Sequence, residues 1–465
     1  MFTIPSEHRR RFQHSGQEHV FAWWDQIDDA QRKELLVQLQ ALDLEEIKKL
    51  YERRQEQFAL PDRGRIKPIE RIAPEPGAGK RLNILGEAAW RLGQVAILIV
   101  AGGQGSRLGF DHPKGMFPVG PVTNKALFQI HAEKVLALRR RYQTSIPLLI
   151  MTSPATHRET EDYFGQNKFF GLPAQEVFFF CQGTMPALDL ATGKLLMEAP
   201  GRLFTSPNGH GGTLTALVSS GLLERIRTQG IRTIFYFQVD NPLVDLADIA
   251  FLGGHLNENA DLSCKVLVKE APAEKLGLFG LVDGRLTMIE YSDLPEDLAR
   301  QTDEQGRLRF WPGNPAIHLF QVDFLERVTR DQHGLPWHVA KKKVPCLDAA
   351  GNLVEPDKEN ALKFEKFIFD AFPLAERWWL APANRRAEFM PLKNASGPES
   401  PQTVRQAIRN LAGDWLQGAG VTVPRQANGD VAVPLEISPL FALDAAELAA
   451  KADPRWRIDG PRYFG

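Results

Sequence analysis

The chain has 465 residues, of which 43% are hydrophobic and 24% charged, a composition typical of a soluble protein with a large core. Its 56 basic and 57 acidic residues nearly balance, which excludes an overall basic field that would hold it on nucleic acid or an anionic membrane. The chain contains no apolar run long enough to span a bilayer, no secretion signal and only three scattered cysteines, so we expect a cytoplasmic protein without disulfides.

The N-terminal region is expected to be helical. Between residues 25 and 57, apolar side chains recur near helical spacing, and neither proline nor glycine interrupts them. Residues 61–80 then contain four prolines and three glycines, which predicts a linker. We therefore expect a helical region with its linker at 1–90, a core domain at 91–394 and a small C-terminal domain at 395–465.

Short, nearly continuous apolar runs predict strands that are buried on both faces, and a helical pattern at 126–141 lies between the first two of them. This alternation favours an α/β fold with a largely parallel sheet and helices on both sides. In such a sheet, ligands bind at the carboxyl ends of the strands. The predicted strands are VAILIVA at 95–101, IPLLIMT at 146–152, VFFFC at 177–181, IFYFQV at 234–239 and LSCKVLV at 262–268.

Later segments depart from this alternation. Residues 278–294 contain Asp283-Gly284 between two apolar runs, which predicts a β-hairpin inserted into the α/β layout. The stretch ALKFEKFIFDAF at 361–372 is expected to be helical. Prolines, polar residues and the short runs VTVP and VAVPLEI beyond about residue 395 fit a separate C-terminal domain.

The stretch IVAGGQGSRLGFDHPKGMFPVG at 99–120 contains a glycine-rich loop directly after a predicted strand. Glycines let backbone N–H groups approach phosphate or nucleobase atoms closely. The spacing disfavours a dinucleotide motif, because Gly109 comes one residue late for G-x-G-x-x-G. It also disfavours a P-loop, because Lys114 follows Pro113 and no serine or threonine follows it. What remains is a loop whose Arg107 and Lys114 are close enough in sequence to reach one polyphosphate.

Together with the motifs that follow it, this loop resembles the UTP:sugar-1-phosphate uridylyltransferases, in particular the eukaryotic-type UDP-N-acetylglucosamine pyrophosphorylases. Similar motifs occur in the same order and at similar spacing from about residue 98 to residue 394. The resemblance implies a Rossmann-like nucleotidyltransferase core with a mixed, mostly parallel sheet, a helical N-terminal region and a small C-terminal domain. The motifs are AGGQGSRLGFDHPKGMFPVG, ALFQIHAEK, FFFCQGTMPAL, PNGHGGTLTAL, QVDNPL, IEYSDL, GNPAIHLF, HVAKKKVP, LKFEKFIFDAF and EFMPLKN.

The resemblance assigns the glycine loop to a uridine nucleotide. It implies that Ala101, Gly102 and Gly103 present backbone atoms near the uracil. Gln182 would bind the uracil edge through its amide, and Gly209 would do so through its backbone. An ordinary loop hydrogen bond is the alternative role for Gln182.

Four cations and one carboxylate are expected at the phosphates. Arg107 and Lys114 would face the triphosphate, and Lys363 and Lys393 match family lysines that contact phosphate. Asp240 follows a predicted strand, where a carboxylate can hold Mg²⁺ near phosphate oxygens. Magnesium is preferred to zinc because the sequence has no His/Cys cluster. The alternatives are solvated surface cations and an Asx turn.

The sugar would be bound by Gly277, Glu290 and Asn314, since a carboxylate and an amide can hydrogen-bond hydroxyl or acetamido groups. A cross-strand salt bridge is the alternative role for Glu290. His210 could bind a sugar hydroxyl or a phosphate. It stands where acetylglucosamine enzymes of this family commonly have asparagine, and the Gly-His-Gly sequence that results is reminiscent of the UDP-glucose branch.

The implied reaction joins UTP and a sugar 1-phosphate into a UDP-sugar with release of pyrophosphate, and N-acetylglucosamine 1-phosphate is the expected acceptor. A UDP-glucose or broad UDP-sugar pyrophosphorylase and a non-catalytic nucleotide-sugar-binding regulator are the alternatives. A dehydrogenase is disfavoured by the late Gly109, and a glycosyltransferase by the absence of Asp-x-Asp after a strand. Neither a nucleic acid nor a membrane partner is expected, and the sequence leaves the oligomeric state open.

Overall fold

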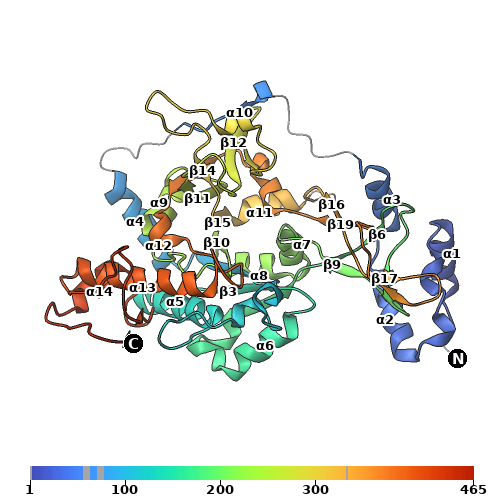
Figure 1. Cartoon of the computed structure of the whole chain (residues 1–465), viewed down its shortest axis with the longest axis horizontal. Coiled ribbons are helices and arrows are strands. Elements are labelled where there is room, and N and C mark those ends of the chain that lie inside the picture. Colours follow the sequence, from blue (N-terminus) through green and yellow to red (C-terminus); the bar gives the residue numbers. More distant parts are fainter. Residues whose placement is uncertain (1–2, 56–62, 71–77, 331–333) are drawn as a thin grey trace. The chain divides into compact units, whose positions relative to one another are not determined.

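The computed structural model describes residues 3–55, 63–70, 78–330 and 334–465 (Figure 1). The chain divides into two compact units, and each is built from separate stretches of sequence. Unit 1 comprises residues 1–60, 182–212 and 335–368, and unit 2 comprises residues 61–181, 213–334 and 369–465.

The main sheet belongs to unit 2 and has eleven strands among the described residues. Its path runs β1-β12-β14-β11-β15-β10-β2-β3-β4, with β13 attached to β12 and β20 attached to β11. The strands are β1 (Ile66–Lys67), β2 (Val95–Val100), β3 (Leu148–Thr152), β4 (Val177–Cys181), β10 (Thr233–Gln238), β11 (Leu262–Val268), β12 (Leu278–Val282), β13 (Arg285–Ile289), β14 (Pro312–Gly313), β15 (Ile317–Gln321) and β20 (Trp378–Pro382).

The five strands predicted from apolar runs are all present, as β2, β3, β4, β10 and β11. The neighbours β10, β2, β3 and β4 are parallel, whereas β15 pairs antiparallel with both β10 and β11. The predicted α/β class with a mixed sheet is confirmed. The parallel strands end at the same edge, and the glycine loop follows the first of them in sequence.

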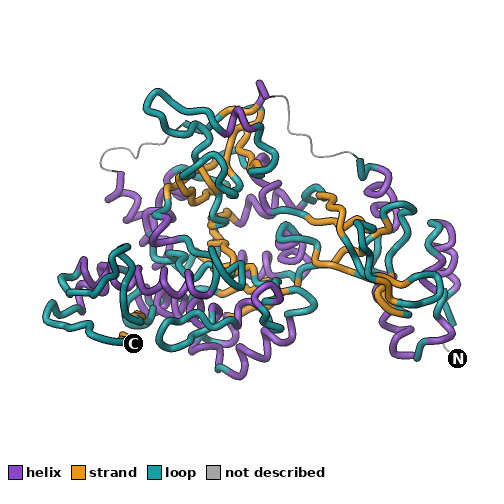
Figure 2. Tube along the Cα trace, in the orientation of Figure 1, coloured by secondary structure: helices purple, strands orange, loops and turns teal. Residues whose placement is uncertain are grey.

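Helices cover both faces of this sheet, as Figure 2 shows. Successive side chains of a strand point to opposite faces. Phe235 and Phe237 accordingly contact rings of helices α9 and α5, while Tyr236 packs on Phe320 of β15. The helices from α4 onward are α4 (Ala78–Arg91), α5 (Leu127–Tyr142), α6 (His157–Gln166), α7 (Gly212–Ser219), α8 (Leu222–Thr228), α9 (Ile249–Asn257), α10 (Glu296–Ala299), α11 (Val322–Thr329), α12 (Arg385–Glu388), α13 (Pro401–Gly418) and α14 (Ala445–Lys451).

Part of the predicted linker is structured. Strand β1 pairs with β12, and helix α4 begins within the predicted range. Residues 61, 62 and 71–77 of that prediction lie outside the described residues. Helix α4 packs on α9 through bare glycine backbone: a Cβ at Gly86 would lie 2.0 Å from the Ile249 carbonyl oxygen, and a Cβ at Gly253 would lie 1.8 Å from that of Leu82. This contact joins α4 to unit 2.

The predicted hairpin is confirmed as β12 and β13, which pair from Leu278 with Ile289 to Val282 with Arg285. Asp283 and Gly284 form its turn, and both have positive φ, 52° and 78°. Such a turn matches the right-handed twist of the flanking strands.

The C-terminal residues form a cluster of buried apolar side chains of their own around α13, α14 and the pair β21 (Leu435–Ile437) and β22 (Arg462–Phe464). Ser400 caps α13, with Pro401 at its first position. Arg141 of α5 forms ion pairs with Asp444, which caps α14, and with Glu447 of α14, so this region is attached to the core helix. The expected domain boundaries at residues 90 and 394 stay predictions.

Unit 1 contains the predicted N-terminal helices and several short sheets. Residues 25–55 form α2 and α3 with turns, as expected, and residues 56 and 57 of that prediction lie outside the described residues. The elements are α1 (Ser6–His14), α2 (Asp29–Gln40), α3 (Leu44–Glu52), β5 (Thr184–Pro186), β6 (Leu188–Asp189), β7 (Met197–Ala199), β8 (Arg202–Leu203), β9 (Thr205–Pro207), β16 (His338–Lys342), β17 (Cys346–Leu347), β18 (Leu353–Val354) and β19 (Ala361–Glu365).

The expected helix over residues 361–372 is wrong. Residues Ala361–Glu365 form strand β19, the middle strand of the sheet β16-β19-β6, and a 3₁₀ helix covers Ile368–Leu374. Pairing with two strands distant in sequence outweighs the helical pattern of the segment, as tertiary contacts often do. Lys363 is therefore positioned by a strand.

Candidate active site

The glycine loop leaves the carboxyl end of β2 and is attached to the segment of β3. Ala101 is buried, and its amide donates to the Met151 carbonyl at 2.8 Å. The carbonyl of Gly102 accepts a hydrogen bond from the Ser153 hydroxyl at 2.7 Å. The loop therefore begins at the sheet edge where ligands bind in open α/β sheets.

The glycines of the loop differ in what requires them. A Cβ at Gly105 would lie 2.6 Å from the Phe110 carbonyl oxygen. A Cβ at Gly115 would lie 2.3 Å from the ring of Phe128, so internal packing requires both glycines. Gly103, in contrast, is exposed, and a Cβ there would meet nothing within 4 Å. Its bare backbone is available to a ligand.

We expect Gly115→Ala to lower the free energy of unfolding by about 1–3 kcal/mol, because the added methyl group overpacks the fully buried Phe128 ring. Gly103→Ala is the matched control and should stay within about 0.5 kcal/mol of the parent chain. Urea unfolding followed by fluorescence measures both. Equal stability losses in the two variants would contradict the distinction.

Two of the predicted phosphate-binding groups meet in the structure. Lys114 begins a short 3₁₀ helix, Lys114–Met116, and its Nζ lies 3.4 Å from Oδ2 of Asp240. The Lys114 side chain is 22% exposed and that of Asp240 10%, so the pair is partly shielded from water. Arg107 lies in the 3₁₀ helix Ser106–Leu108 and is exposed. The loop thus has one cation paired with the carboxylate and one directed to solvent.

The segment that leads to Lys393 forms hydrogen bonds with Asp240 and its neighbour Asn241. The backbone carbonyl of Asp240 accepts from the Leu392 amide at 2.9 Å. The Asn241 side chain donates to the Glu388 carbonyl at 2.8 Å and accepts from the Met390 amide at 3.1 Å. The QVDN and EFMPLKN motifs therefore lie side by side.

A pocket of about 180 Å³ opens beside this junction. It is smaller than the roughly 300–1,000 Å³ of sites that enclose a drug-sized ligand, and so suits a compact group such as a single sugar ring. The pocket brings together five predicted residues from five separate stretches of the sequence, and these are Asp240, Gly277, Glu290, Asn314 and Lys393.

Hydrogen bonds with backbone groups fix the position of Asn314 beside Gly277, two of the residues predicted to bind the sugar. The Asn314 amide donates to the Gly277 carbonyl at 2.8 Å, and Asn314 Oδ1 accepts from the Ala316 amide at 2.8 Å. A Cβ at Gly277 would lie 3.8 Å from Oε2 of Glu290 and 2.8 Å from the Met288 sulfur. The absent side chain at Gly277 thus keeps the Glu290 carboxylate accessible from the pocket.

Lys393 lines the same pocket and is 44% exposed. Its Nζ lies 3.3 Å from Oε1 of Glu399, and its amide donates to the Glu399 carbonyl at 2.8 Å. An exposed ion pair of this kind contributes little to stability, so the lysine can exchange this partner for a ligand anion.

The other predicted residues belong to unit 1. Gln182 is buried, with 6% of its surface exposed. Gly209 has a φ of +82°, and a Cβ there would lie 2.4 Å from the Lys366 carbonyl oxygen. The backbone thus requires glycine at this position for its own conformation and packing.

His210 is part of the packing of unit 1. Its Nδ1 accepts from the Ile368 amide at 3.3 Å, and its ring stacks on Phe367 with centroids 5.4 Å apart. Burial lowers the pKa of His210 to about 4, with the nearby His338 acting in the same direction. The imidazole is therefore neutral at neutral pH and provides no cation for a phosphate.

Lys363 projects from β19, with Nζ 4.9 Å from the centroid of the Phe204 ring. Burial lowers its pKa, an effect that Glu365 opposes and Lys342 reinforces. The basic run Lys341–Lys343 is exposed. Lys363 is therefore distinguished from these neighbours by its partial burial.

Sequence reasoning missed three supporting residues, His131, Lys134 and Asn241. Each of their side chains bonds to backbone beside Asp240 or Lys393. A signal was available for the first two: they lie three positions apart, and so on one face, in the helix predicted over ALFQIHAEK. Asn241 follows Asp240 directly, but nothing in the sequence reveals that it bonds to residues 388–390.

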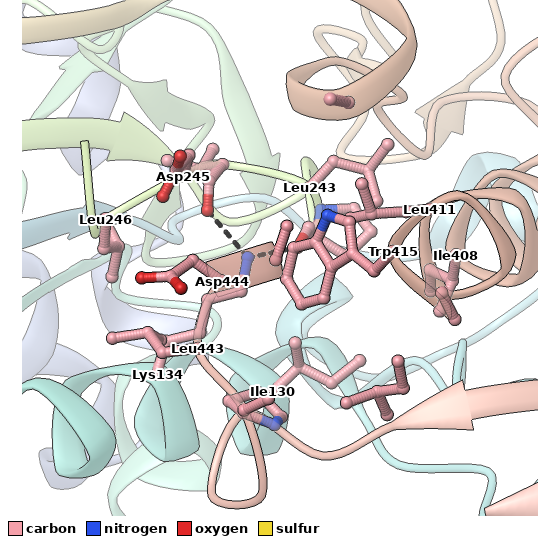
Figure 3. Close-up of a pocket in the computed structure, with 18 of the residues that line it drawn as sticks. Ile130, Lys134, Leu243, Asp245, Leu246, Ile408, Leu411, Trp415, Leu443 and Asp444 are labelled. Carbon is pink, nitrogen blue, oxygen red and sulfur yellow. Dashed lines mark hydrogen bonds between the residues drawn. The ribbon is translucent and has the colours of Figure 1, made fainter. Parts of the chain in front are cut away.

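A second cavity of unit 2, of about 430 Å³, contains none of the predicted site residues (Figure 3). Its wall includes residues 242–246, which follow Asp240, and apolar side chains of α13 such as Ile408 and Trp415. Lys134 of α5, Asp245 and Asp444 are polar residues labelled at this cavity in Figure 3. The wall of this cavity therefore includes the segment that follows Asp240 in the sequence.

The described residues contain neither a side-chain cage for a metal ion nor a helix that could span a membrane. Within them, no three His, Cys, Asp or Glu side chains gather as a metal cage. None of the helices they form is both long enough and apolar enough to cross a bilayer. None of the three cysteines, Cys181, Cys264 and Cys346, forms a disulfide with another described residue, and Cys181 is half-buried.

Comparison with known proteins extends this picture along the chain. A family model described as UTP–glucose-1-phosphate uridylyltransferase matches residues 43–398. UDP-N-acetylglucosamine diphosphorylase 2 of Arabidopsis thaliana is 35% identical over 473 residues, covering 95% of this chain and 90% of the relative. UDP-N-acetylglucosamine pyrophosphorylase of Saccharomyces cerevisiae is 35% identical over 441 residues, covering 89% and 92%.

A solved structure agrees in fold. The crystal structure of a putative UDP-N-acetylglucosamine pyrophosphorylase from Entamoeba histolytica superposes with a TM-score of 0.77 at 30% identity. The match covers 86% of this chain and all of that one. The range of the family model, residues 43–398, includes all residues of the small pocket.

Proposed function

Because the chain belongs to the UTP–glucose-1-phosphate uridylyltransferase family, we propose that it makes UDP-N-acetylglucosamine and pyrophosphate from UTP and N-acetylglucosamine 1-phosphate. It is a nucleotidyltransferase. The observation that carries the proposal is the pocket in which Asp240, Gly277, Glu290, Asn314 and Lys393 meet. The names of both relatives specify N-acetylglucosamine, and this chain matches them along nearly their whole length. These matches support the choice of sugar.

The proposed reaction needs no covalent enzyme intermediate. A phosphate oxygen of the sugar 1-phosphate attacks the α-phosphorus of UTP. The bond from that phosphorus to the oxygen bridging the α- and β-phosphates breaks, and pyrophosphate leaves with the electron pair. Both reactants are anions, so the protein must align them and neutralise charge. Arg107, Lys114, Lys363 and Lys393 are the cations proposed for this work.

Each reactant has a proposed set of contacts. The backbone of Ala101, Gly102 and Gly103 receives the uridine nucleotide, supported by the open space around Gly103. Gln182 and Gly209 of unit 1 keep the uracil contacts that the resemblance implies. Glu290, Asn314 and the Gly277 backbone bind the sugar. His210 is neutral and packed on Phe367, which supports a role as a hydrogen-bonding or packing group.

Mg²⁺ is proposed as the cofactor, held by Asp240. The donor set fits this ion: two carboxylates, Asp240 and Glu290, line the pocket, and Mg²⁺ usually combines one or two carboxylates with waters and substrate phosphates. When bound, the ion would neutralise phosphate charge in the transition state. We also propose a cytoplasmic location, which the lack of disulfides among the three described cysteines supports.

The direct test is pyrophosphate release with UTP, Mg²⁺ and four sugar 1-phosphates: those of N-acetylglucosamine, N-acetylgalactosamine, glucose and galactose. We expect N-acetylglucosamine 1-phosphate to give the highest kcat/KM. Glucose 1-phosphate giving the highest value would replace the proposed sugar, an outcome that the Gly-His-Gly sequence at His210 would explain. No release with any of the four would favour a non-catalytic nucleotide-sugar-binding protein.

We expect Glu290→Gln to raise the KM for the sugar 1-phosphate about tenfold, because a hydrogen bond to a charged acceptor contributes about 1.5–3 kcal/mol. The KM for UTP should stay within about twofold. Glu296→Gln, which removes an exposed carboxylate just beyond the hairpin, is the control. An equal rise in both KM values would contradict the assignment of Glu290 to the sugar.

A further inference from the structure

Helix α5 also holds the segment that carries Asp240, in addition to the contacts from residues 388–392. His131 Nε2 lies 2.9 Å from the Val239 carbonyl oxygen. One helical turn later, the Lys134 ammonium donates to the carbonyls of Pro242 and Val244 at 2.6 and 2.7 Å. These three bonds bracket Asp240 in the sequence.

His131 is suited to a fixed bond. It is fully buried and packs on the Phe237 ring of β10, with centroids 4.9 Å apart. Burial lowers the pKa of His131 to about 3, with Lys134 acting in the same direction, so the ring is neutral at neutral pH. A carbonyl can only accept, and so Nε2 carries the proton and Nδ1 is the acceptor nitrogen.

Burying the Lys134 side chain costs more free energy than burying the neutral His131 ring, because the lysine is charged. Its ammonium lies against two neutral carbonyls beside the apolar cavity of Figure 3. Burial lowers its pKa to about 8, and the neighbouring Asp245 carboxylate acts in the opposite direction. Burying a cation is unfavourable unless its donors are satisfied. Because Lys134 donates two hydrogen bonds to one backbone segment, it is well placed to fix the position of that segment.

We propose that His131 and Lys134 are positioning residues, which set the place of the Asp240 carboxylate by holding the backbone at Val239, Pro242 and Val244. The proposal rests on the proposed function for its catalytic consequence. It explains why the ALFQIHAEK motif accompanies QVDN although none of its side chains lines the small pocket. Neither residue is catalytic, because each acts through the Asp240 segment.

The geometry leaves few other ways to fix this segment. After β10 ends at Gln238, the Val239 amide still donates to β2 at Val100, but the chain then leaves the sheet. Asn241 and the Asp240 carbonyl bond residues 388–392 on one side. His131 and Lys134 supply the bonds on the other. Losing either set frees one side of the carboxylate-bearing turn.

The test compares Lys134→Met with Arg140→Met, which removes an exposed cation from the same helix. We expect Lys134→Met to lower kcat by about 10–100-fold, the usual effect of losing a group that orients a metal ligand. The KM for the sugar 1-phosphate should stay within about twofold. Arg140→Met should match the parent chain. Lys134→Arg, which restores donors, should recover part of the loss.

Two readouts besides activity separate positioning from general destabilisation. Hydrogen exchange should become faster in residues 239–247 of Lys134→Met while the other strands of the sheet keep their protection. Calorimetry should show UTP binding weakened in the presence of Mg²⁺ and unchanged with EDTA. Unchanged exchange in 239–247, or equal loss of UTP affinity with and without Mg²⁺, would overturn the proposal.

His131 is tested with two variants because it is fully buried. His131→Leu removes the donor, and His131→Gln keeps a donor near Nε2. We expect the leucine variant to reproduce the exchange and Mg²⁺ effects of Lys134→Met and the glutamine variant to be milder. Equal effects of the two would reject the hydrogen bond as the cause. If the parent chain releases no pyrophosphate from any sugar 1-phosphate, the proposed function fails, and hydrogen exchange alone still decides whether Lys134 and His131 hold the segment.

Discussion

Asp240→Asn is expected to lower kcat by about 10²–10³-fold, equivalent to about 2.7–4 kcal/mol of transition-state stabilisation. The carboxylate is the proposed Mg²⁺ ligand and the partner of Lys114 at 3.4 Å. Asparagine has the same shape but no charge, so it weakens both interactions at once. The backbone bond from the Leu392 amide to the residue 240 carbonyl does not depend on the side chain. The fold should therefore persist.

The measurement is steady-state pyrophosphate release at several Mg²⁺ concentrations. We expect the Mg²⁺ concentration for half-maximal rate to rise together with the fall in kcat. Asp323→Asn, an exposed carboxylate on α11, is the matched control and should behave like the parent chain. A rate within tenfold of the parent, with an unchanged Mg²⁺ requirement, would show that Asp240 is not the ligand.

Arg107→Ala is expected to lower kcat/KM about 100-fold, the effect of losing roughly 3 kcal/mol of preorganised charge stabilisation. Arg107 is exposed in the glycine loop, and its side chain forms no ion pair among the residues that the structure describes. Its removal should thus leave the thermal midpoint unchanged within about 1 °C. A guanidinium without an internal partner is free to bind phosphate oxygens.

The control for this prediction is Arg300→Ala, which removes an exposed arginine from an ordinary i,i+4 pair with Glu296. Arg107→Lys should recover part of the rate, because it restores the charge but not the two-pronged geometry. Near-normal turnover of Arg107→Ala would reject the assigned role, and a large loss of stability would reassign the residue to the folding of the loop.

The sequence predicted the strands of the core and the position of Asp240 for a physical reason. Strands buried on both faces are nearly continuous apolar runs, so β2, β3, β4, β10 and β11 are visible locally. Polar residues that follow such runs then share one edge of a parallel sheet. Asp240 was found in this way, whereas the sugar-binding residues depended on resemblance to a family.

What escaped prediction depends on pairing between distant segments. Lys363 was expected on a helix because residues 361–372 read as helical in isolation, but β19 is fixed by pairing with β16 and β6. The bonds of Lys134 and Asn241 likewise connect segments more than a hundred residues apart. Local periodicity contains no information about such partners.

The composition of unit 1 also has a consequence for biosynthesis. Its core joins apolar side chains of α2 and α3, such as Leu35 and Ile47, to Leu203 and finally to Leu362 and Phe364. At about 5–20 residues per second, the ribosome delivers the last of these roughly 15–60 s after the first. Until then the apolar side chains of the N-terminal helices lack these partners, so we expect the packing of unit 1 to be completed only after β19 has been synthesised.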